Sequence, residues 1–122
     1  MNSKGQSLVL FILTLPIILL ILVMIIDISK MTLLKNEINN INYIAIDYAL
    51  DNYDNIDINE IKQLIYKNKS DINDILIENK DNKIYIKITY KSNLTIFRDI
   101  FKIESIYTGY IDNLEKIIER VK

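Results

Sequence analysis

The sequence predicts an α+β protein in which a long N-terminal helix, transmembrane and then amphipathic, precedes a small antiparallel sheet of about three strands with short helices. Three observations support this. An uncharged apolar run fills residues 8–26, and apolar residues then recur at helical spacing as far as residue 48. Beyond residue 74, apolar and polar residues alternate, as they do in strands with one buried face.

The apolar run, LVLFILTLPIILLILVMII, reads as a membrane anchor. Residues 8–26 would form about 28 Å of helix, close to the ~30 Å hydrocarbon core of a bilayer. Because no small-x-small pattern follows it, we expect an uncleaved anchor rather than a secretory signal. Lys4 and the N-terminal amine lie on one side and nearly balanced charges on the other, so we expect a single-pass cell-membrane protein with a cytoplasmic N-terminus.

These boundaries divide the chain into four parts. We expect a cytoplasmic lead peptide at 1–7, a transmembrane helix at 8–26, an amphipathic helical extension at 27–50 and a small extracytoplasmic α+β domain at 51–122. Fewer than 100 residues follow the anchor, enough for one small domain.

Two features of the long helix are candidate functional elements. Pro16 removes a backbone donor and predicts a kink, which is either incidental or a flexible point that helps the helix leave the bilayer. The amphipathic part carries a heptad-like seam that we expect to pack partly on the chain's own domain and partly on neighbouring copies or partners. The seam consists of Met31, Leu34, Ile38, Ile41, Ala45 and Tyr48.

Composition argues against several functions. The chain has no His and no Cys. Its net charge is −1 and its basic and acidic residues alternate, so no basic stripe is available to bind nucleic acid. The acidic stretch at 51–57 lacks the glycine and spacing of a calcium loop, and no serine lies in a nucleophile motif. We therefore expect no enzymatic activity, no catalytic residues, no metal and no cofactor.

The outer domain is expected to begin with a helix and continue with strands. Asp57 and Glu60 form a capping box for a helix at 58–67, and Asp112 and Glu115 form another for a short C-terminal helix carrying Leu114, Ile117, Ile118 and Val121. Strands are expected at 75–78, 84–91 and 103–111, with a loop or short helix at 94–101 between the last two.

The N-terminal residues resemble those of the TadE-like family of the tight-adherence (Tad/Flp) pilus machinery, which is type IV pilin-like. That family's segment G-x-x-x-V-E-F-A-L-x-x-P is matched by Gly5, Val9, Phe11, Leu13 and Pro16, and an acidic and a basic residue follow at Asp27 and Lys30. The match covers about 26 residues; the later stretch, IKITYKSNLTIFRDIFKIESIYTGYI, is similar only in outline.

The resemblance implies a pilin or pseudopilin processed between Gly5 and Gln6 by a prepilin-type peptidase. Its partners would be the lipid membrane, the pilus or pseudopilus subunits and their assembly platform. Leu10 stands where the family has a glutamate that is thought to pair with a neighbouring subunit's N-terminal amine. A minor, initiating or tip subunit, or an assembly factor, therefore fits better than a regular major subunit.

An alternative interpretation is a bitopic scaffold or sensor of an unrelated envelope complex, with an uncleaved anchor. Such a protein needs no glycine at position 5, so the fate of the Gly5–Gln6 bond distinguishes the two.

Overall fold

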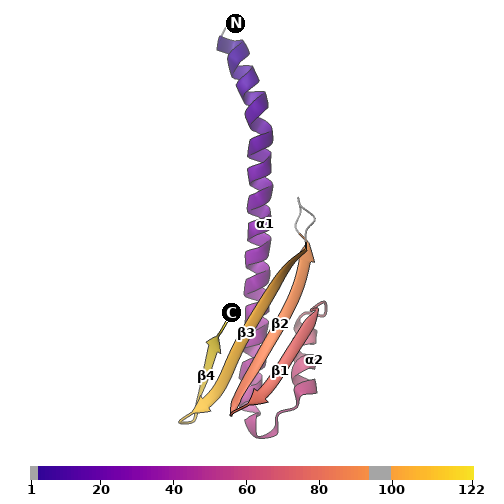
Figure 1. The fold of residues 1–122 in the computed structure, drawn as a ribbon, viewed down its shortest axis with the longest axis vertical. Coiled ribbons are helices and arrows are strands. Elements are labelled where there is room, and N and C mark those ends of the chain that lie inside the picture. Colours follow the sequence, from indigo (N-terminus) through magenta and orange to yellow (C-terminus); the bar gives the residue numbers. More distant parts are fainter. Residues whose placement is uncertain (1–2, 94–99) are drawn as a thin grey trace.

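The computed structural model describes residues 3–93 and 100–122 (Figure 1). A long helix is followed by a 3₁₀ turn, a short helix and four strands. In chain order these are α1 (Ser3–Asp51), the 3₁₀ turn (Tyr53–Asn55), α2 (Ile58–Asn68), β1 (Asp74–Lys80), β2 (Lys83–Asn93), β3 (Ile100–Asp112) and β4 (Glu115–Arg120).

Helix α1 is continuous over 49 residues and passes through Pro16. Its N-terminal half projects beyond the sheet, whereas its C-terminal half lies along one face of it (Figure 1). By length and composition α1 is able to cross a membrane, and its most apolar window has none of its residues buried. The expected transmembrane and amphipathic parts are thus two halves of one rod.

The four strands form an antiparallel meander in the order β1-β2-β3-β4. Two tight turns connect β1 to β2 and β3 to β4, and both have two successive residues with positive φ: Asp81 (54°) and Asn82 (61°), then Asn113 (50°) and Leu114 (66°). Such turns match the right-handed twist of paired strands. A two-residue turn therefore joins β1 to β2, and another joins β3 to β4.

The hydrophobic core lies between the sheet and the two helices. Strand β2 contributes Ile84, Ile86 and Ile88, all fully buried, and α2 contributes Ile61 and Ile65. The expected alternation on β3 is confirmed, since its buried side chains include Phe101, Ile103 and Ser105, and Gly109 is buried on the same face. An α+β fold with a long N-terminal helix on an antiparallel sheet is thus confirmed.

The prediction of a short C-terminal helix is wrong. Residues Glu115–Arg120 form β4, which pairs with β3 in the register Asp112↔Glu115 to Tyr107↔Arg120. The acidic residues at 112 and 115 do not cap a helix; they flank the Asn113–Leu114 turn. Pairing satisfies the backbone of β3 along this edge, an advantage that a short isolated helix could not offer. The sheet has four strands instead of about three.

The other strands are also longer than expected, because strand pairing continues beyond the residues that alternate between apolar and polar. Strand β1 exceeds the expected 75–78 at both ends, β2 continues to Asn93, and β3 begins at Ile100 and so includes the end of the expected loop at 94–101. The rest of that loop lies outside the described residues. Helix α2 is one residue longer than expected, and α1 reaches Asp51, within the stretch expected to be a loop.

Gly109 allows α1 to approach β3 closely. A Cβ atom at this position would lie 2.5 Å from Cγ2 of Ile46 and 3.1 Å from Cδ1 of Leu50. We expect Gly109→Ala to lower the free energy of unfolding by about 1–3 kcal/mol through overpacking. Urea unfolding of the full chain in detergent micelles, followed by circular dichroism, measures this. In a double-mutant cycle, Ile46→Leu removes the clashing methyl group and should reduce the penalty; an unchanged penalty would contradict the steric explanation.

Candidate membrane and assembly surfaces

The N-terminal half of α1 is an uncovered apolar surface. The large hydrophobic side chains of residues 8–26 are between 43% and 64% exposed, apart from the half-buried Val23. Water-soluble proteins rarely expose so large a contiguous apolar patch. This surface is suited to lipid tails or to other apolar helices.

The residues singled out near the N-terminus all lie within this helix. Gly5 is half-buried and Gln6 is exposed, in the first turns of α1. Pro16 lies in unbroken helix, and the predicted kink remains a prediction. Two residues earlier, the Thr14 hydroxyl donates to the carbonyl oxygens of Leu10 (2.9 Å) and Phe11 (3.1 Å), so the hydroxyl of this exposed stretch has partners within the helix itself.

The predicted seam faces mainly the chain's own sheet. Ile38, Ile41 and Ala45 belong to the buried core, Leu34 and Tyr48 are partly buried against it, and Met31 is 38% exposed. Outside the seam, the exposed large apolar side chains on this half of α1 are Ile28 (60%), Leu33 (69%), Tyr43 (48%) and Ile44 (40%). Any helix that packs on α1 from outside would meet these residues.

A buried polar contact, which the sequence pattern did not predict, joins α1 to the sheet. Asn42, which is not one of the seam residues, is fully buried, and its Nδ2 donates to the carbonyl oxygens of Ile86 (3.0 Å) and Ser105 (3.0 Å) and to Ser105 Oγ (3.2 Å). Asn39 is also buried. Asn42 lies four residues from Ile38 and three from Ala45, and this spacing places it on the same helix face as the seam. That spacing could have predicted its burial.

The membrane-proximal turns of α1 are tied to the end of the sheet. Asp27 is 6% exposed although it directly follows the apolar run, and Lys30 Nζ donates to the carbonyl oxygen of Asn93 at 3.0 Å. In Figure 1, the ends of β2 and β3 that carry Asn93 and Ile100 lie toward the N-terminal half of α1. The sheet is therefore held close to the point where the helix would leave a membrane.

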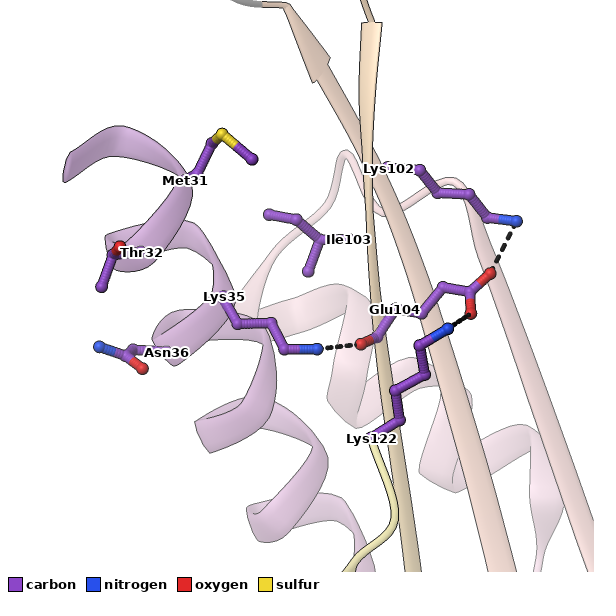
Figure 2. A pocket seen from close by; sticks show the side chains of 8 residues that line it. All are labelled: Met31, Thr32, Lys35, Asn36, Lys102, Ile103, Glu104 and Lys122. Atoms are coloured by element: carbon purple, nitrogen blue, oxygen red, sulfur yellow. Dashed lines mark hydrogen bonds and ion pairs between the residues drawn. The ribbon is translucent and has the colours of Figure 1, made fainter. Parts of the chain in front are cut away.

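A basic cleft of about 520 Å³ opens between α1 and β3 (Figure 2). We define the basic cleft by its lining residues: Met31, Thr32, Lys35, Asn36, Lys102, Ile103, Glu104 and Lys122. It lies where β4 has ended, because β4 pairs with β3 only from Tyr107 onward. The Glu104 carbonyl accepts a hydrogen bond from Lys35, which caps this part of the β3 edge.

One carboxylate in the basic cleft is shared by several ammonium groups. Glu104 lies 2.7 Å from Lys102, 3.1 Å from Lys122 and 4.0 Å from Lys87. Hydrogen bonds from Lys102 and Lys122 lower the pKa of Glu104 to about 2. Burial lowers the pKa of Lys35, and the nearby charges of Arg120 and Lys122 lower it further. Positive charge is therefore in surplus here.

The Glu104 ion pairs predict a pH dependence of stability. Because its pKa is lowered in the folded state, Glu104 stabilises the fold above the unfolded pKa of about 4.3, and this contribution is lost as pH falls toward 2. The urea midpoint should fall across this window, and Glu104→Gln should flatten the fall. Glu78→Gln, an exposed change on β1, serves as the control; equal pH profiles for wild type and Glu104→Gln would contradict this role.

The opposite end of α1 is held by a second charge cluster. Lys116 of β4 contacts Asp47 at 2.8 Å and Asp51 at 2.6 Å, and both carboxylates raise the pKa of Lys116. At α2, Asp57 caps the helix by accepting from the Asn59 backbone N–H at 3.0 Å, as expected. Glu60 accepts instead from the Tyr48 hydroxyl, so this carboxylate fixes α2 to α1.

Within residues 3–93 and 100–122, no three His, Cys, Asp or Glu side chains come together as a group that could hold a metal ion. The acidic stretch after α1 forms a 3₁₀ turn and a helix cap. Comparison with protein-family models, curated proteins and solved structures finds no match to this chain. The arrangement itself, a long apolar N-terminal helix followed by an antiparallel sheet, is consistent with a type IV pilin-like architecture.

Proposed function

We propose that the protein is a membrane-anchored TadE-like pilin or pseudopilin, a minor subunit or assembly factor of a Tad-type surface pilus. The observation that carries the proposal is the division of α1: its N-terminal half is uncovered and apolar, and its C-terminal half is built into the domain. A subunit of this shape can be stored in a bilayer and can also join a bundle of equivalent helices without refolding.

The membrane half of α1 also supports a minor rather than a regular role. Leu10 is 63% exposed and apolar, so a neighbouring subunit's N-terminal amine would find no carboxylate there. Burying an ammonium group without a partner is costly, and regular stacking of this chain on itself is correspondingly disfavoured. A position at one end of a fibre, or a transient role during assembly, avoids that cost.

The test is the mature N-terminus of the protein in its native membrane, read by intact mass and N-terminal sequencing. We expect a chain that begins at Gln6, and we expect Gly5→Phe to leave the lead peptide attached. Ser3→Phe is the matched control, because it places the same ring two residues farther from the bond. A wild-type chain that retains residues 1–5 would refute processing and favour the bitopic scaffold or sensor.

A further inference from the structure

We propose that the basic cleft binds the phosphate headgroup of an anionic phospholipid and so fixes the domain against the membrane surface. This inference rests on the proposed function in one respect, namely that the apolar half of α1 lies in a bilayer. It adds a ligand class and a site that membrane anchoring alone does not require.

The first argument is charge. Lys35, Lys102 and Lys122 line the basic cleft, and Glu104 is the one carboxylate among the eight lining residues. Lys87 forms an ion pair with the same carboxylate, at 4.0 Å, from the neighbouring strand β2. Three ammonium groups thus gather around the Glu104 carboxylate, and a fourth, that of Lys35, donates to the Glu104 backbone carbonyl from the α1 side of β3 (Figure 2).

The strand pairing adds to this surplus. Lys91 and Lys102 are direct partners in the β2–β3 register. Like charges placed opposite each other destabilise a sheet. A bound anion beside Lys102 would offset this repulsion, and the ammonium groups of the basic cleft present donors suited to phosphate oxygens.

The second argument is position. Met31, at the rim of the basic cleft, lies five residues beyond the apolar run, or about 7.5 Å along the helix. The headgroup layer beyond the hydrocarbon core is about 5–7.5 Å thick on each side, so the rim lies at the outer edge of the headgroup layer. On the helix, the Thr32 hydroxyl donates back to the carbonyl oxygen of Ile28, one turn nearer the apolar run, whereas Lys35 reaches across the basic cleft to the Glu104 carbonyl (Figure 2).

The exposed residues around the rim agree with an interfacial location. Ile28 is 60% exposed and Leu33 is 69% exposed, so apolar side chains continue past the run into the first turns beside the basic cleft. Lys30, on the same turns, holds the end of β2 by its bond to Asn93. A mixture of apolar and cationic side chains at this depth suits the boundary of an anionic membrane.

The experiment uses the full chain in lipid nanodiscs of phosphatidylcholine alone or with about one third phosphatidylglycerol. The acetylation rates of individual lysines are read by mass spectrometry, with exposed Lys80 on β1 as the internal reference. We expect Lys102 and Lys122 to react roughly threefold more slowly in the anionic discs, and high salt to remove the difference. Inorganic phosphate added to phosphatidylcholine discs should not reproduce it.

Variants isolate the basic cleft itself. The double variant Lys102→Gln/Lys122→Gln should abolish the lipid-dependent protection of Lys35, whereas Lys62→Gln/Lys67→Gln on α2 should retain it and leave the reference Lys80 in place. Equal rates in both disc types, equal protection by inorganic phosphate, or protection that rises with the number of chains per disc whatever the lipid would overturn the inference. A chain that does not co-elute with either disc would instead refute the membrane anchor and with it the proposed function.

Discussion

Asn42→Asp is expected to lower the free energy of unfolding by about 3–5 kcal/mol at neutral pH, because it buries a charge beside two carbonyl oxygens and a hydroxyl group, with no cation among the partners that Asn42 has in the described part of the chain. Asn42 is fully buried, and its amide nitrogen lies 3.0 Å from the carbonyl oxygens of both Ile86 and Ser105. In the aspartate variant an oxygen would face those two oxygens, with the Ser105 hydroxyl as the donor within reach. The substitution changes charge and hydrogen bonding with almost no change in volume.

Two further variants separate the causes. Asn42→Leu should cost only about 1 kcal/mol, since Asn42 Oδ1 is buried without a partner among the described residues and its removal offsets part of the loss. Asn40→Asp, an exposed change on the same helix, should have almost no effect. Urea unfolding of the full chain in detergent micelles, read by circular dichroism and tyrosine fluorescence, gives the values. A leucine variant as unstable as the aspartate variant would show that the amide, and not the introduced charge, decides the outcome.

Ile38→Ala is expected to lower the free energy of unfolding by about 2–5 kcal/mol. Ile38 lies on α1 with no exposed surface and is part of the core, so truncation leaves a cavity between the helix and the sheet. The same unfolding measurement applies. A loss below about 1 kcal/mol would indicate that the helix and sheet close the gap by shifting.

The matched control is Leu33→Ala, because Leu33 is on the same helix but 69% exposed. Its effect on unfolding should stay within about 0.5 kcal/mol. If α1 packs on other subunits, this variant should instead reduce the amount of the protein recovered in the assembled pilus fraction. The pair thus separates residues that stabilise the domain from residues available to partners.

Elements with a strong local pattern could be predicted from the sequence. The uncharged run specified the N-terminal half of α1, and the alternation Ile84, Ile86, Ile88 specified β2 and its buried face. Strand β4 had no such pattern. Ile117 and Ile118 are adjacent, their spacing from Leu114 suits a helix, and the turn before them lacks glycine. Only the open edge of β3, a tertiary feature, makes a strand the better state.

The basic cleft could not be predicted for a different reason. Lys35 and Glu104 are 69 residues apart in the chain, and each charge alone looks like an ordinary solvated side chain. Their meeting depends on the register of β3 against α1, which in turn depends on the close approach at Gly109. The burial of Asn42 could not be predicted either, because a polar residue next to the seam is buried only if a strand supplies carbonyl oxygens opposite it.

The order of the chain imposes a delay on folding. Asn42 and its partner Ser105 are 63 residues apart, so the buried stripe of α1 is synthesised well before the strands that cover it. At 5–20 residues per second, the interval is roughly 3–13 s. Until β3 has been synthesised, this apolar stripe has no strand to cover it, and it is open to proteolysis and to non-native contacts.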